Sequence, residues 1–320
     1  MAKIISLVYC QKNSANFNTL RDDYNIGDYN LSDLNTANTW AMDYIKVALK
    51  VKLMKGYGNG TFAPQRQVTR AETATVTYNI LGLPSGISTA TVLIPEGYTA
   101  SQIGDRLEAY GVCKKAEFLS TINSYDFNYY PLVSKIVPNP NRCYKLEGYL
   151  FPDTYEFYIN TQPQDVIGKM LRDAEVKIGE NYSYSGMTTD EIITLASIIQ
   201  KEAASLDQMK KVSSVFHNRL KQGMRLEADP TIYYVENYLK PNITGDKDRF
   251  NAYYNTYKCN ALPSGAICNP GALALEAAVS PADTTYLYFV TDNSGNYYYA
   301  TTYAEHLQNL IKAGKSPSLS

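Results

Sequence analysis

The chain lacks long apolar runs, basic clusters and all but two histidines, and each of these absences argues against a class of protein. The longest apolar stretches, such as residues 192–199, are interrupted by polar side chains and are far shorter than the roughly 18 residues that span a membrane, so no transmembrane segment is expected in this chain. Lys and Arg total 30 against 31 Asp and Glu, without a basic block, which argues against nucleic acid as a partner. The two histidines are too isolated to complete a metal site, so we expect neither a metal nor a cofactor.

The cysteines and the start of the chain leave the cellular compartment open. Five cysteines, at positions 10, 113, 143, 259 and 268, show no metal-ligand spacing. Cys259 and Cys268 flank a turn-rich segment and are able to pair if the protein is exported, whereas the odd count also fits free thiols in a reducing or anaerobic setting. Residues 1–10 hold a charge and a short apolar run, but no complete signal-peptide core or cleavage site follows, so no export signal is visible.

Length and composition favour a multidomain protein of mixed secondary structure. The 320 residues correspond to about two domains, and an apolar share of 45% is enough for ordinary cores. Strand and helix patterns are mixed without the regular alternation of a doubly wound sheet, which favours an α+β fold. Helices are predicted at residues 40–49, 68–81, 101–110, 115–122 and 168–178. A further helix ends near 202, and the pattern TTDE at residues 188–191 supplies its capping box. A strand and turn are predicted at 91–97, and a hairpin with strands 286–290 and 297–300.

Residues 31–84 carry the pattern of a small helical module, and residues 1–30 before it show no assignable pattern. A helix pattern beginning at Trp40 is followed by a Gly-rich loop, GYGNGTFAP, at residues 56–64. A second helix then opens with a capping-box pattern, TRAE, at residues 69–72. In this order the features resemble an S-layer homology module.

That resemblance implies binding of an acidic secondary wall polysaccharide, and with it a location at the cell wall or the extracellular surface. Arg70 at a helix N-terminus suits a carboxylate-bearing sugar. Trp40 and Gly58 are the other candidate residues for binding the wall polymer. The alternative is that Arg70 forms an ion pair within the module and that the glycines serve only tight turns.

The most informative segment is the apolar helix pattern LASIIQKE at residues 195–202. Three of its apolar residues lie seven, four and three positions before Glu202, offsets that share one face of an α-helix. Burial beside apolar neighbours raises the pKa of a carboxyl group and keeps it protonated near neutrality, as a general acid requires. The alternative is an amphipathic helix whose last turn simply reaches solvent.

Several separated motifs accompany this helix. They are LEGYLFPDTYEF at residues 146–157, VSSVFHNRL at 212–220, GMRLEADPT at 223–231, YNTY at 254–257 and LPSGAICNPG at 262–271. Their order and spacing resemble the MltG (YceG-like) family of endolytic murein transglycosylases, across residues 91–310. The resemblance implies a catalytic domain at 141–320 with Glu202 as the catalytic residue, and a LysM-like subdomain at 91–140 behind a linker at 85–90. That subdomain either binds glycan or only packs against the catalytic domain.

The implied activity is cleavage of the MurNAc-β-1,4-GlcNAc bond of peptidoglycan without water. In such a reaction Glu202 donates a proton to the departing sugar and then accepts one from the muramic acid C6 hydroxyl, which closes to a 1,6-anhydro end. Two alternatives stay open. A hydrolytic muramidase needs a second carboxylate, for which Asp229 and Glu147 are candidates. A non-catalytic wall-binding protein would carry Glu202 outside any groove.

Polar residues of the same motifs are candidates for binding the sugar. Carboxylates, amides and a phenol suit N-acetyl and hydroxyl groups. Each has a structural alternative, because Asp229 and Asn269 precede prolines and form ordinary turns, while Glu147 is able to cap a helix or pair with a nearby cation. The implied partners are peptidoglycan strands, the wall polysaccharide and peptidoglycan synthases. The predicted substrate-binding residues are Glu147, Asp229, Tyr254, Asn255 and Asn269.

Overall fold

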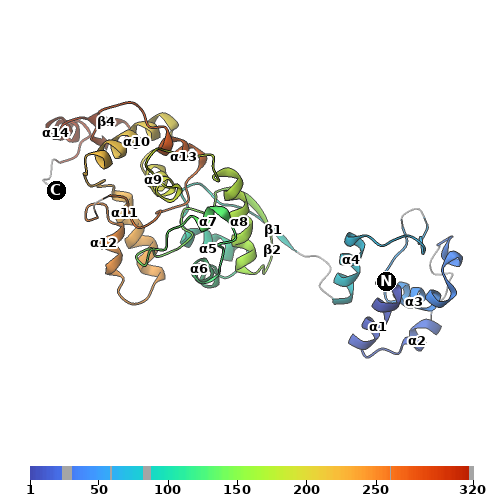
Figure 1. Cartoon of the computed structure of the whole chain (residues 1–320). Helices are drawn as coiled ribbons and strands as arrows, with labels where there is room; N and C mark the ends of the chain where they lie inside the picture. Colours follow the sequence, from blue (N-terminus) through green and yellow to red (C-terminus); the bar gives the residue numbers. More distant parts are fainter. Residues whose placement is uncertain (24–30, 58–59, 82–87, 260, 317–320) are drawn as a thin grey trace. The chain divides into compact units, whose positions relative to one another are not determined.

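Two compact units make up the protein in the computed structural model, Met1–Ile87 (unit 1) and Ser88–Ser320 (unit 2). The structure describes residues 1–23, 31–57, 60–81, 88–259 and 261–316 (Figure 1). Residues 85–87, half of the predicted linker at 85–90, lie outside the described residues, and its last two residues already belong to a strand of unit 2. Within the described part of the chain, no helix has the length and hydropathy needed to cross a membrane.

Unit 1 is built from helices around two small apolar clusters. One cluster joins Ile5, Ala48, Leu53 and Val76, so the segment that the sequence left unassigned contributes to the core of this unit. The helices predicted from Trp40 and from Thr69 are both present. The elements are α1 (Ala2–Lys12), α2 (Phe17–Asp22), the 3-10 turn η2 (Leu34–Thr36), α3 (Thr39–Lys50) and α4 (Arg70–Leu81).

Two carboxylates fix the loops of unit 1. Asp33 accepts hydrogen bonds from the backbone N–H groups of Phe62 and Ala63, at 2.6 and 2.7 Å, and these bonds lower the pKa of Asp33. At the start of α4, Glu72 N–H donates to Thr69 Oγ1 at 3.2 Å while Thr69 N–H donates to the Glu72 carboxylate at 2.8 Å. The predicted capping box is therefore confirmed. Hydrogen bonds to the Glu72 carboxylate, from Thr69 N–H first and then from the Tyr57 hydroxyl, lower the pKa of Glu72 to about 2.

The first part of unit 2 combines a two-stranded antiparallel sheet with four helices. Strand β1 (Thr89–Leu93) pairs with β2 (Thr154–Tyr158), with Val92 opposite Tyr155. This pairing joins residues on both sides of the boundary predicted at residue 140, so the two predicted subdomains share one sheet. The helices are α5 (Ala100–Ala109), α6 (Lys115–Ser124), α7 (Pro131–Ser134) and α8 (Pro163–Lys177).

The rest of unit 2 is a helical layer that ends in a β-hairpin. The predicted hairpin is confirmed as β3 (Tyr288–Thr291) paired with β4 (Tyr297–Ala300). Figure 1 shows β1 and β2 at one end of unit 2 and β4 with α14 (Tyr303–Lys312) at the other. The remaining elements are α9 (Thr189–Glu202), α10 (Leu206–Lys221), α11 (Asp229–Tyr234), the π-helix η3 (Val235–Leu239), the 3-10 turns η4 (Lys240–Asn242) and η5 (Asp248–Phe250), α12 (Asn251–Tyr254) and α13 (Ala272–Val279). Helices and antiparallel strand pairs together make this an α+β fold.

Helix α9 is the centre of this layer. It begins with a capping box between Thr188 and Glu191, as predicted from the sequence. All eight residues from Ile192 to Ile199 are buried, so the helix is enclosed on every side over two turns, where the sequence suggested one apolar face. It contacts α13, α10 and α11. The first and last turns leave the core, and the last turn carries Lys201 and Glu202.

Candidate active site

Glu202 lies at the point where the buried helix α9 emerges. The backbone leaves the helix at Ala203, which has an extended conformation, and the Tyr297 hydroxyl donates a hydrogen bond to the Glu202 carbonyl. The Glu202 side chain is partly exposed and lines a cavity of about 480 Å³. The lining residues are Lys201, Glu202, Asp229, Pro230, Tyr233, Tyr234, Asn237, Tyr238 and Ile267.

The environment of Glu202 favours its protonated form. Burial and, to a smaller extent, the negative charge of Asp229 raise the pKa of Glu202 to about 7, against the opposing positive charge of Lys315. Near neutral pH, this carboxyl group therefore exists in both protonation states. A group of this kind is able to donate a proton and to accept it back at the same pH.

Asp229 is held in the cavity by the turn that precedes α11. Arg219, a buried residue of α10, donates hydrogen bonds from Nη1 to the carbonyl groups of Arg225 and Leu226, at 3.0 and 3.1 Å, and to the carboxylate of Glu227 at 2.9 Å. Glu227 itself has a φ of 51°, a left-handed conformation that disfavours a residue with a side chain. The motif at 223–231 thus reverses the chain and delivers Asp229 to the first turn of a helix.

A tyrosine fixes the orientation of the Asp229 carboxylate. The Tyr257 hydroxyl donates a hydrogen bond to Asp229 Oδ1 at 2.8 Å, and burial together with this acceptor raises the pKa of Tyr257. Asn255 Oδ1 accepts from Tyr257 N–H at 2.9 Å and so shapes the turn that presents the tyrosine. The two predicted residues Asn255 and Asp229 are therefore linked through Tyr257.

Further lining of the cavity comes from the rest of α11 and from the π-helix η3. Tyr233 of α11 is 59% exposed and offers an aromatic face on which a sugar ring can stack. Asn237 and Tyr238 belong to η3, and π-helical turns of this kind are frequent at functional sites. The arrangement supplies one protonatable carboxyl, one fixed carboxylate, an amide and phenols around an open cavity, which suits a polar, ring-shaped ligand.

Glu147 lies behind this wall in the protein interior. Its side chain is buried and accepts hydrogen bonds from Ala100 N–H at 2.9 and 3.0 Å, from Tyr234 Oη at 3.0 Å and from Asn269 Nδ2 at 2.9 Å. Burial raises the pKa of Glu147 to about 7, and these hydrogen bonds oppose the rise. Its contacts join the start of α5 to the end of α11.

Asn269 and Tyr254 are also buried and bonded to protein groups. Asn269 Oδ1 accepts from Gly148 N–H and Leu150 N–H, at 3.0 and 2.8 Å. The Tyr254 hydroxyl accepts from Cys143 N–H at 3.2 Å. In this conformation both side chains hold loops in place, and direct sugar binding by Glu147, Asn269 or Tyr254 stays a prediction.

The candidate residues of unit 1 are described in part. Trp40 is 65% exposed and lines a cavity of about 610 Å³ within unit 1, together with Tyr57 and Arg66. Arg70 is exposed at the start of α4, and the structure gives it no ion pair within the described residues. Gly58 lies outside the described residues.

The described residues hold neither a metal-binding cluster nor a disulfide. The residues that the structure covers contain no group of three or more His, Cys, Asp or Glu side chains able to hold a metal ion. All five cysteines are free, so Cys259 and Cys268 are unpaired here. Cys268 is buried and its thiol donates to the Ser197 carbonyl at 3.2 Å, which ties the loop before α13 to α9.

Comparison with known proteins identifies the family. The family model described as YceG-like matches residues 30–312. The chain belongs to the YceG-like family. The match includes Glu202, Asp229 and the motifs around them, and it also includes residues 31–84, which we interpreted as a separate module.

Several relatives of this YceG-like chain carry names or structures. A Streptococcus pneumoniae protein named endolytic murein transglycosylase is 31% identical over 244 residues, which cover 70% of this chain and 44% of the relative. A Bacillus subtilis protein of the same name is 34% identical over 200 residues, 61% of this chain and 55% of the relative. This chain thus spans about half the length of these curated relatives. The crystal structure of a YceG-like protein from Listeria monocytogenes matches with a TM-score of 0.61 and 35% identity, covering 74% of this chain and 80% of that chain.

Some residues in and around the cavity were not among the predicted site residues. Tyr257 belongs to the YNTY motif at 254–257, but only the fold shows that its hydroxyl donates to the carboxylate of Asp229, 28 positions earlier in the chain. Tyr233 and Tyr234 were visible as an adjacent pair of aromatic residues, whereas Asn237 and Tyr238 gave no signal because a π-helix has no distinctive sequence pattern.

Proposed function

We propose that this YceG-like protein is an endolytic lytic transglycosylase that cleaves the MurNAc-β-1,4-GlcNAc bond of peptidoglycan. The observation that carries the proposal is the carboxyl group of Glu202, with a pKa raised to about 7, lining an open polar cavity. The names of the Streptococcus and Bacillus relatives support the substrate and the reaction class.

Glu202 acts twice in the proposed reaction. In its protonated form it gives a proton to the glycosidic oxygen while the anomeric carbon gains oxocarbenium character. The resulting carboxylate then takes the proton of the muramic acid C6 hydroxyl, whose oxygen closes on the anomeric carbon to leave a 1,6-anhydro end. A pKa near the working pH suits both steps. Tyr233 supports a stacked sugar ring, and Asn237 offers an amide for an N-acetyl or hydroxyl group.

Hydrolysis of the same bond is the second candidate function, because Asp229 lines the same cavity as Glu202. A hydrolase would use the second carboxylate as a nucleophile or as a base for water. Glu147 is the weaker candidate for that role, because it is buried and already accepts hydrogen bonds from three groups.

Analysis of the released ends decides between these functions. Purified protein is incubated with intact peptidoglycan beside Glu202→Gln, and the ends are identified by mass spectrometry. Glu180→Gln, a substitution of an exposed glutamate, is the matched control. Anhydro-muramyl ends that fall at least 100-fold in Glu202→Gln but persist in the control support the transglycosylase. Reducing ends would indicate hydrolysis, and binding without release of ends would indicate a wall-binding protein without catalysis.

We further infer that residues 31–84 of unit 1 form an S-layer homology module that attaches the protein to an acidic wall polysaccharide at the cell surface. The exposed cation of Arg70 at a helix start and the exposed indole of Trp40 support this role. Sedimentation with purified cell walls tests it. Arg70→Gln and Trp40→Ala are expected to reduce the bound fraction at least fivefold, while Lys46→Gln, on the same unit, leaves it unchanged. Equal binding by all four proteins would contradict the inference.

A further inference from the structure

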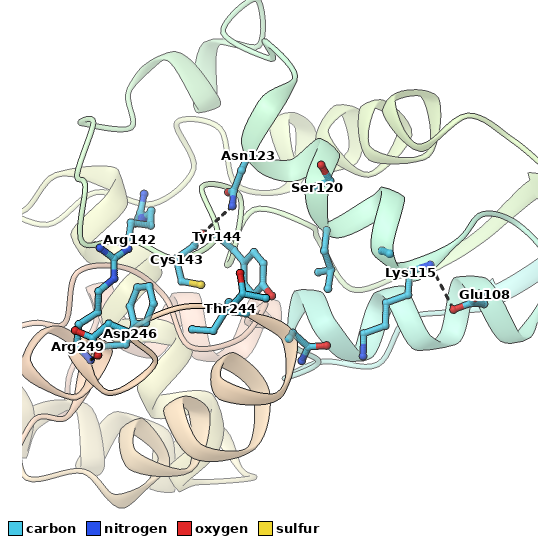
Figure 2. A pocket seen from close by; sticks show the side chains of 15 residues that line it. Glu108, Lys115, Ser120, Asn123, Arg142, Cys143, Tyr144, Thr244, Asp246 and Arg249 are labelled. Carbon is cyan, nitrogen blue, oxygen red and sulfur yellow. Dashed lines mark hydrogen bonds between the residues drawn. The ribbon is translucent and has the colours of Figure 1, made fainter.

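A second cavity of about 860 Å³ lies in unit 2, away from Glu202. Helix α6 forms one side and residues 242–250 form the other, with residues 142–144 between them. In Figure 2, Arg142 and Arg249 are on one side of Cys143 and Tyr144, and Lys115 with Glu108 is on the other. The cavity shares no lining residue with the Glu202 cavity.

The floor of this cavity contains polar groups without partners. Tyr144 is only 4% exposed, and its hydroxyl has no hydrogen-bond partner among the described residues. Arg142 is bound through Nη2 to the Asp190 carboxylate at 2.7 Å, but its Nε and Nη1 are buried and find no partner in the same part of the chain. Buried polar groups are nearly always satisfied in native proteins, because leaving them unpaired costs free energy. Unpaired donors at a cavity therefore indicate a place for an acceptor from a ligand.

The charges of the lining are unevenly compensated. Lys115 is paired with Asp105 at 2.8 Å and Glu108 with Lys114 at 3.1 Å, so the α6 side is balanced. On the other side Arg249 is exposed and lies over the Phe250 ring at 4.6 Å, and the described residues give its guanidinium no acidic partner. Among the described residues, the Asp246 carboxylate accepts a hydrogen bond from the Arg249 backbone N–H at 3.2 Å. A guanidinium without an acidic partner, in a lining that also holds a buried phenol, favours a carboxylate ligand.

The two cavities are separated by one short segment of chain. Tyr238 lines the Glu202 cavity and Asn242 lines the second one. Asn242 Nδ2 donates to the Tyr238 carbonyl at 2.9 Å and to Ser101 Oγ at 3.0 Å, which ties this segment to α5. A branched polymer whose backbone occupies the first cavity is therefore able to direct a side branch toward the second.

We propose that this second cavity binds the peptide branch of peptidoglycan through a carboxylate of that branch. The proposal rests on the proposed function, since it takes peptidoglycan as the substrate. Arg249 pairs with the carboxylate, and the Tyr144 hydroxyl donates to it or to a neighbouring peptide carbonyl. Binding here makes the protein distinguish peptide-bearing strands from strands without peptides.

Calorimetric titration of the full chain with the isolated tetrapeptide branch tests the proposal. The peptide is compared with the same peptide after amidation of its carboxylates. We expect Arg249→Gln to weaken peptide binding at least fivefold and Tyr144→Phe at least threefold. The amidated peptide should bind at least tenfold more weakly to the wild-type protein. Arg172→Gln, an exposed arginine on α8 outside both cavities, is the matched control and keeps wild-type affinity.

Several outcomes would overturn the proposal. These are equal peptide affinity in Arg249→Gln and wild type, no peptide binding at all, or stronger binding of peptide-free glycan with the same dependence on Arg249. Because Arg249 is exposed, its variant stays informative even if Tyr144→Phe fails to fold. The titration measures binding of a free peptide and involves no glycan cleavage. A negative result there would contradict the peptide site without contradicting the proposed transglycosylase activity, which the analysis of glycan ends tests.

Discussion

At the scale of single residues, the pKa of Glu202 links the cavity to a pH dependence. The first step needs a protonated Glu202, so glycan cleavage should fall as pH rises above about 7. The negative charge of Asp229 contributes to this pKa, so Asp229→Asn should lower it and move the descending limb to lower pH by roughly half to one unit. Initial rates of end formation between pH 5 and 9 measure the shift. Asp207→Asn is the control, and an unmoved limb in Asp229→Asn would contradict the electrostatic coupling.

The same carboxyl group should weaken the fold at high pH. Its pKa is about 7 in the folded protein against 4.5 ordinarily, so the folded state binds the proton more tightly than the unfolded chain. This contribution is fully present below about pH 4.5 and is lost as pH rises through 7. Glu202→Gln cannot ionise and should therefore raise the free energy of unfolding at pH 8 by about 3 kcal/mol.

Urea unfolding at pH 8 and pH 4.5 checks this expectation. The difference between Glu202→Gln and wild type should shrink toward zero at the lower pH. The exposed Glu180→Gln should match wild type at both. A variant that is less stable than wild type at pH 8 would show that the carboxylate makes a stabilising contact.

Some features of single residues could be predicted from the sequence, and others depend on contacts between distant segments. Three apolar neighbours at helical spacing drew attention to Glu202, because helix periodicity is local, and the family resemblance then implied its catalytic role. That Asp229 is held by Tyr257 depends on two segments meeting in space, and that Glu147 is buried depends on α5 packing over it. Residue type alone predicts neither contact. In the sequence, a carboxylate that faces a ligand cannot be distinguished from one that accepts hydrogen bonds at the start of a helix.

At the scale of elements, Glu147 joins α5 to α11. Glu147→Ala would leave Ala100 N–H and the donors of Tyr234 and Asn269 without their acceptor, and should lower the free energy of unfolding by about 2 to 4 kcal/mol. Glu147→Gln keeps the volume and one acceptor oxygen, so its loss should be smaller. Urea unfolding measures both. Equal stability of Glu147→Ala and wild type would show that this link is dispensable.

Elements with local signals were predicted well, and those without were missed. Capping boxes at Thr69 and Thr188 marked two helix starts correctly, because both partners lie within one turn. Helix α1 was missed for a physical reason. Its apolar residues Ile4, Leu7 and Val8 are exposed while Ser6 is buried, so hydrophobicity does not mark the face that packs.

At the scale of the whole molecule, each unit has its own apolar core. No cluster of buried side chains combines residues of both among those described. Residues 88–320 alone should therefore fold and cleave soluble glycan within about twofold of the full chain, while losing retention on cell walls. Thermal melting and end analysis of the shortened protein check this. A shortened protein that aggregates or loses cleavage would show that unit 1 supports the fold of unit 2.

The π-helix η3 makes the lining of the Glu202 cavity depend on the exact number of residues in that helix. Its turns hold more residues than those of an α-helix, so it shifts the phase of every side chain after α11. Removing one residue between Val235 and Leu239 would restore ordinary helical phase and rotate the following side chains by about 100° around the axis. Tyr238 would then point elsewhere while the helix itself survived. If a variant with one residue deleted here folds well but no longer cleaves glycan, the number of residues in η3 matters to the cavity as much as their side-chain chemistry does.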